Sequence, residues 1–85
     1  MINEINKYNK IESLDSLPLG GRCRVQYLAS DGNIRRRMLD LGIIKDTEIA
    51  ALTKSPSGDP VAYLIRGAVI AIRKEDAALI FIETI

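Results

Sequence analysis

Three consecutive arginines, Arg35, Arg36 and Arg37, and a single cysteine, Cys23, are the side chains in this sequence most suited to chemistry. Guanidinium groups form forked, charge-assisted hydrogen bonds with carboxylates and phosphates, so an arginine cluster is typical of a surface that binds an anionic partner. A solvated helix face without a partner fits the same arginines equally well. The alternating residues around Cys23 favour a small buried side chain over a ligand or a reactive thiol.

The composition limits what this chain can catalyse. It contains no histidine, so no imidazole can transfer a proton or hold a metal, and the lone cysteine has no base of the usual kind. Cysteine–histidine zinc spacing is absent, and carboxylates such as Asp31, Asp59 and Glu75 do not follow an EF-hand or another compact chelate. We therefore expect no enzyme, no cofactor and no dedicated metal site.

A helix over Ile34–Leu41 is predicted to present the arginines. Asn33 is a suitable N-cap, because its side-chain oxygen can accept a backbone N–H of the first turn. Apolar residues at i, i+4 and i+7 give this helix one buried stripe. Gly42 stands where a left-handed residue is expected to end the helix. Arg36 lies opposite the stripe and can pair with Asp40 four residues later.

Alternating apolar residues predict five short strands. The first strand directs Cys23, Val25 and Tyr27 toward the interior. The last strand is apolar on both faces, which is typical of a strand inside a closed structure, and Phe81 is expected to be interior. Gly67 permits a tight turn between the third and fourth strands. The predicted strands are residues 22–28, 47–53, 61–65, 68–72 and 79–85.

These elements predict a mainly β fold, a small and strongly bent five-stranded antiparallel barrel with one short inserted helix and short helical turns. Residues 1–11 are interpreted as a flexible N-terminal lead-in and residues 12–85 as the single domain. The segment Ser55–Pro60 is a stiff loop with two prolines, and a stiff exposed loop loses little entropy when it docks. The aliphatic excess also permits a homodimer.

The charge balance and hydropathy argue against two kinds of partner. The net charge is +1, so the chain would attract nucleic acid only weakly. It has three tyrosines and one phenylalanine, which are few aromatic rings for bases to stack on. No run of about 18 apolar residues is present, so no membrane insertion is expected. A polar N-terminus without a signal-peptide core and a single cysteine favour a cytoplasmic protein.

Several segments occur in an order that resembles a known family. They are Leu17–Gly20, Arg35–Gly42, Ser55–Pro60, Arg66-Gly67 and Ile70–Arg73 with Glu75 and Ala77. Together they resemble the FeoA family, the small cytosolic component of bacterial ferrous iron uptake, from about Leu14 to Glu83. One departure follows the helix, where the family usually has Pro-Gly and this chain has Lys45-Asp46. Aspartate accepts a left-handed backbone less readily than glycine, so this turn is expected to differ.

The resemblance implies an SH3-like barrel associated with FeoB, a membrane transporter with a cytosolic GTP-binding domain. We accordingly expect a non-enzymatic accessory or regulatory protein that docks on the cytosolic part of the transporter. An Fe²⁺-responsive metal-binding switch is the first alternative and a nucleic-acid-binding barrel the second; iron enters by family association alone. Gly42 and Gly67 are expected to be structural. The candidate partner-binding residues are Arg35, Arg36, Arg37, Asp59, Pro60 and Arg66.

Overall fold

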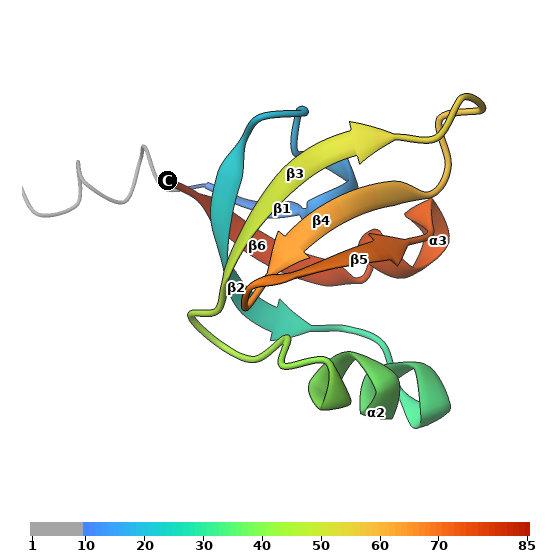
Figure 1. Cartoon of the computed structure of the whole chain (residues 1–85). Helices are drawn as coiled ribbons and strands as arrows, with labels where there is room; N and C mark the ends of the chain where they lie inside the picture. The colour runs from blue at the N-terminus through green and yellow to red at the C-terminus, as the bar shows by residue number, and fades with distance from the viewer. Residues whose placement is uncertain (1–9) are drawn as a thin grey trace, which may run out of the picture.

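The computed structural model describes residues 10–85, and within them six antiparallel strands form one curled sheet (Figure 1). The order across the sheet is β1-β6-β2-β3-β4-β5, so β1 and β5 are its two edges. The strands are β1 (Ile11–Ser13), β2 (Arg22–Leu28), β3 (Glu48–Lys54), β4 (Val61–Ile65), β5 (Ala68–Ile72) and β6 (Ile80–Thr84). The helical segments are the 3-10 turn η1 (Leu14–Ser16), α2 (Gly32–Asp40) and α3 (Lys74–Ala77).

The inside of the curled sheet is aliphatic. Buried positions alternate with more exposed ones along β2, the first part of β3, the end of β4 and β6. Tyr63 is the largest fully buried side chain. Leu14 on η1 is completely buried, which gives the apolar last strand the cover that its composition requires. Burying one such aliphatic side chain stabilises the fold by about 1.5–3 kcal/mol. These aliphatic side chains form the hydrophobic core of the described residues.

The prediction of a mainly β barrel with one inserted helix is confirmed, and the strand count differs from it. The additional strand is β1, which pairs with β6 so that Ile11 lies opposite Glu83. Ile11, interpreted from the sequence as the end of the lead-in, therefore belongs to the sheet. The remainder of that lead-in, residues 1–9, lies outside the described residues. The segment Ile-Glu-Ser is too short to carry an alternation signal of its own, and its register comes from the neighbouring strand.

The prediction that Tyr27 and Phe81 lie inside the barrel is wrong. Tyr27 is 53% exposed and Phe81 is half-buried, and their rings stack with centroids 4.9 Å apart. Phe81 lies between the buried Ile80 and Ile82, so the regular alternation of β6 already turns it outward. For Tyr27 the cause is an irregularity in the β2–β6 pairing between Val25 and Tyr27. An extra residue in one strand shifts every later side chain to the other face, so the alternation that buries Val25 turns Tyr27 outward.

Helix α2 ends in a complete Schellman motif. Gly42 has φ +88°, its N–H donates to the Leu39 carbonyl at 2.9 Å, and the Ile43 N–H donates to the Met38 carbonyl at 3.1 Å. Met38 and Ile43 are both buried in the core, which supplies the apolar contact that accompanies this motif. The end of the helix is thereby fixed to the barrel.

The start of α2 and the turn that follows the helix both differ in detail from the sequence-based expectation. The helix begins at Gly32 after an Asp31 N-cap, so Asn33 lies within the first turn. The sequence Lys45-Asp46, where the family usually has Pro-Gly, still forms a left-handed turn, because Asp46 adopts φ +73°. Aspartate is among the few residues other than glycine that tolerate this conformation.

Candidate partner-binding site

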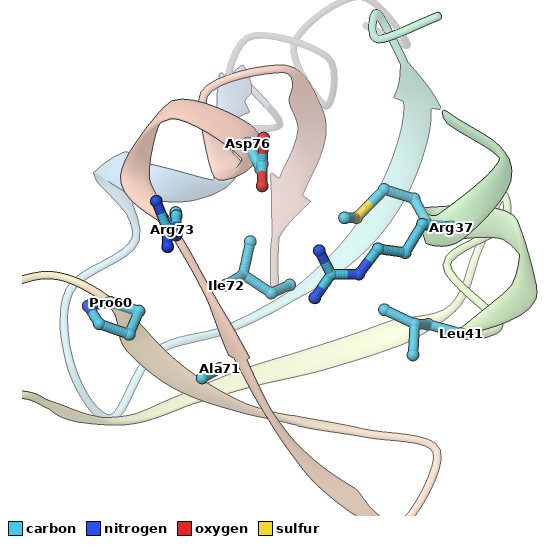
Figure 2. Close-up of a pocket in the computed structure, with 8 residues that line it drawn as sticks. Arg37, Leu41, Pro60, Ala71, Ile72, Arg73 and Asp76 are labelled. Carbon is cyan, nitrogen blue, oxygen red and sulfur yellow. The ribbon is translucent and has the colours of Figure 1, made fainter. Parts of the chain in front are cut away.

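A groove of about 180 Å³ opens between α2, β5 and the first turn of α3 (Figure 2). Pro60, from the loop between β3 and β4, lies at one end of it. The apolar part of its lining consists of Met38, Leu41, Pro60, Ala71 and Ile72. The charged part consists of Arg37, Arg73 and Asp76. An apolar lining with a few charged groups is the usual composition of a recognition site.

Arg37 extends from the last turn of α2 over Ile72, across the groove from Arg73 and Asp76 (Figure 2). Its position is stabilising, since a positive charge near a helix C-terminus complements the helix dipole. Both arginines are exposed. Among residues 10–85 the one ion pair joins two other side chains, so no carboxylate in this part of the chain lies within 4.0 Å of either guanidinium nitrogen. Both groups are available to an anionic partner.

The three consecutive arginines do not act as one cluster. They project in different directions because successive residues of a helix are rotated by about 100°. Arg35 donates from Nη1 to the Leu28 carbonyl at 3.1 Å, on the side of the helix that faces β2. Arg36 borders a separate depression on the outer side of α2. The predicted pair between Arg36 and Asp40 is not formed. Of the three, Arg37 alone lines the groove.

Asp59 does not line the groove but holds one of the segments that do. Its Oδ1 accepts a hydrogen bond from the Lys74 backbone N–H at 2.8 Å, so it caps the start of α3 across fifteen positions of the chain. A carboxylate at a helix start satisfies a free N–H and complements the helix dipole. This bond ties the β3–β4 loop to α3 and thereby holds Pro60 beside the groove. In the structure the Asp59 carboxylate therefore accepts a hydrogen bond within the chain, whereas the sequence suggested that it contacts a partner protein.

Arg66 lies at the turn between β4 and β5 and does not line the groove. Its side chain crosses Gly42 so closely that a Cβ added there would lie 2.4 Å from Arg66 Cδ. Gly42 is therefore constrained both by its left-handed backbone and by this contact. At the turn itself Arg66 and Gly67 have φ +50° and +83°, the signs of a type I′ turn.

Sequence reasoning missed two of the charged groups in the groove. Arg73 follows β5 directly and Asp76 lies on α3, and the fold brings both of them opposite a helix some thirty-five residues earlier in the chain. Their position at the junction of a predicted strand and a predicted helical turn was the available signal.

The titratable groups inside the barrel are not suited to acid–base work near neutral pH. Burial raises the pKa of the Cys23 thiol to about 11 and that of the Tyr63 hydroxyl to about 12, so both stay protonated. Across residues 10–85 no three Cys, Asp or Glu side chains gather as a metal-binding group. The same part of the chain has no helix long and apolar enough to cross a membrane.

A small barrel whose thiol and phenol are kept neutral, and whose groove presents exposed guanidinium groups that pair with no carboxylate of residues 10–85, has the properties of a binding domain. The family model of the FeoA domain matches residues 12–84. The chain belongs to the FeoA family.

Relatives and solved structures agree with this assignment. The chain is 32% identical over 72 residues to the Fe(2+) transport protein A/Fe(2+) transporter FeoB fusion protein of Porphyromonas gingivalis, which covers 85% of this chain and 8% of that protein. The chain thus spans under a tenth of the length of this relative. The solution structure of a FeoA-like protein from Clostridium acetobutylicum is 32% identical, with a TM-score of 0.82 over 89% of this chain and 88% of that one.

A second solved structure bears on the fold class. FeoA of Stenotrophomonas maltophilia in complex with zinc, described as a prokaryotic SH3 domain protein, is 26% identical. The TM-score is 0.74 over 82% of this chain and 87% of that one. The expected SH3-like barrel is therefore confirmed.

Proposed function

We propose that this chain is a non-enzymatic accessory protein of ferrous iron uptake that docks through the α2–β5 groove on the cytosolic part of a FeoB-type transporter. The observation that carries the proposal is the pair of exposed guanidinium groups, Arg37 and Arg73, beside the apolar groove lining and Pro60. Guanidinium groups recognise carboxylates through forked hydrogen bonds, and the apolar lining adds contact area.

The fused relative supports the choice of partner. In that protein a domain similar to this chain is joined to a FeoB transporter in one polypeptide. A covalent link keeps two domains at high effective concentration, so a fusion is useful when the domains act together. Domains that act together need a surface of contact, and the groove is the surface we assign to that contact.

Hydrogen bonds within the chain hold both walls of the groove in place. The Schellman motif at Gly42 fixes the turn of α2 that carries Arg37, and the bond from the Lys74 N–H to Asp59 fixes the loop that carries Pro60. Groups that are already held in place lose little conformational entropy on binding, so more of their interaction energy appears as affinity. A charged groove with flexible walls would bind more weakly.

The proposal is tested by titrating the chain against the complete FeoB-type transporter of the same organism in lipid nanodiscs, with empty nanodiscs as the control. We expect saturable binding to the loaded discs alone. The affinity should fall as salt rises, because exposed charge pairs are screened beyond about 10 Å at 0.1 M ionic strength. No binding at tens of micromolar, or equal binding to empty discs, would overturn the proposal.

A further inference from the structure

Strand β5 is an edge of the sheet with an unusually apolar sequence, Ala-Val-Ile-Ala-Ile. In the part of the chain that the structure describes, β5 pairs with β4 and with no other strand. Val69 is 65% exposed there. Natural proteins usually protect such an edge with charges, proline or a covering segment, and β5 contains neither a charge nor a proline. Such an edge can serve as a template for another strand.

The hairpin geometry determines which backbone groups of β5 face outward. Ile65 and Ala68 flank the two-residue turn and therefore form a hydrogen-bonded pair. Hydrogen-bonded and non-bonded pairs alternate along an antiparallel ladder, so Val69 and Ala71 belong to non-bonded pairs. Their N–H and C=O groups are directed away from β4, toward the open side of the sheet.

That open side is also the groove. Ala71 and Arg73 line it from the β5 side, and Arg37 lines it from α2 (Figure 2). Arg66 lies in the turn that precedes β5 and Arg73 directly follows the strand, so a basic residue stands at each end of β5. Asp76 is the one carboxylate of the lining and offsets a single positive charge. The charge of this edge complements an acidic segment.

We propose that β5 binds an extended acidic segment of its partner by strand addition, as a seventh strand of the sheet. The outward N–H and C=O groups of Val69 and Ala71 would pair with the backbone of that segment, one of its apolar side chains would enter the groove, and its carboxylates would bind Arg37 and Arg73. Main-chain pairing supplies affinity in this mode of recognition, and pockets for alternate side chains supply specificity. The identity of the partner as the transporter rests on the proposed function; the mode of binding does not.

Amide hydrogen exchange on the full chain tests the mode of binding directly. The probe is a capped hexapeptide of alternating glutamate and valine, and its control replaces glutamate with lysine. We expect exchange at Val69 and Ala71 to slow at least about tenfold with the glutamate peptide, while Ile70, already paired with β4, changes little. Unchanged exchange at both amides in millimolar peptide, or equal protection by the lysine peptide, would overturn the proposal.

A matched pair of variants extends the test to the transporter. Val69→Pro removes an outward N–H without breaking the β4 ladder, and Val69→Thr keeps that N–H in a side chain of similar shape. On transporter nanodiscs we expect Val69→Pro to bind about tenfold more weakly and Val69→Thr within about twofold of the parent chain. Circular dichroism melts establish that both variants fold.

The two failures are distinguishable. If the parent chain and Val69→Pro bind the transporter equally, strand addition is wrong and docking stands. If the glutamate peptide protects Val69 and Ala71 while the parent chain does not bind the transporter, strand addition stands and the proposed partner is wrong.

Discussion

Cys23 and Tyr63 inside the barrel, and Arg37 and Arg73 in the groove, are reactive or charged side chains in opposite surroundings. The thiol and the phenol are enclosed by aliphatic residues, and burial raises the pKa of each until it stays neutral. The two guanidinium groups are exposed, and within residues 10–85 no carboxylate forms an ion pair with them. Under the proposed function, stability and recognition depend on different residues. Substitutions inside should therefore change unfolding, and substitutions in the groove should change binding.

The largest expected effect is on the interior. Ile65→Ala deletes three carbons from a completely buried position and should lower the free energy of unfolding by about 2–5 kcal/mol. Arg37→Ala should change that free energy by less than about 0.5 kcal/mol, because the side chain is exposed. Urea denaturation followed by circular dichroism measures both. Equal losses for the two variants would remove the distinction between interior and groove.

A glycine at the boundary of the two regions should give the next largest effect. Gly58 and Gly42 both have positive φ, but a Cβ at Gly58 meets nothing within 4 Å, whereas at Gly42 it meets Arg66 Cδ at 2.4 Å. Gly58→Ala should cost about 1–2 kcal/mol for the left-handed backbone. Gly42→Ala should cost slightly more, because the exposed Arg66 side chain must move away from the added Cβ. Adding Arg66→Ala to Gly42→Ala should recover part of that excess; no recovery would contradict the contact.

The loop that holds Pro60 should show a smaller effect. Asp59→Ala removes the acceptor for the Lys74 N–H and should cost about 0.5–2 kcal/mol, as other helix-cap deletions do. Asp59→Asn keeps an acceptor oxygen and should lose less. Thermal melts rank the three chains. If Asp59→Asn and Asp59→Ala are equally destabilised, the cap does not hold the loop.

The ionisation of the buried Cys23 thiol should change stability only at alkaline pH. Its pKa is about 11 in the folded chain and about 9 when exposed, so the folded state binds the proton more tightly. The contribution of this raised pKa to the free energy of unfolding is fully present below pH 9 and is lost as the pH rises from 9 to about 11. Cys23→Ala should flatten the fall of stability across that window, leaving the contribution of Tyr63 above pH 10. A parent and variant with identical pH profiles would contradict this assignment.

The rate of thiol modification is an independent test of the burial of Cys23. In folded protein at pH 8, Cys23 should react with an aromatic disulfide reagent far more slowly than in urea, because the thiol is buried and mostly protonated. Rapid reaction without urea would show that the interior opens readily.

Local patterns were enough to predict much of this fold. The hairpin of residues 61–65 and 68–72 was predicted to the residue, because alternation and the Gly67 turn are both local. The end of α2 followed from Gly42 in the same way. The exposure of Tyr27 could not be predicted, since the alternation of β2 continues unbroken through the irregular pairing that reverses its last side chains. Such irregularities are set by the partner strand.

The site was less predictable than the fold. Arg37 and Pro60 were both among the candidates, and the structure places them on one groove, but Arg73 and Asp76 join them through tertiary packing alone. Asp59 was selected as an exposed acid in a loop. Its bond to Lys74 depends on a helix start fifteen positions later, which no local pattern indicates.

The assignment of recognition to the groove is tested most directly by reversing one charge at two neighbouring positions. Arg37→Glu and Arg36→Glu lie on the same helix and change the net charge equally, but only Arg37 lines the groove. On transporter nanodiscs we expect Arg37→Glu to bind at least about tenfold more weakly, and Arg36→Glu to bind within about twofold of the parent chain. Equal losses for the two variants, or none for either, would contradict the account.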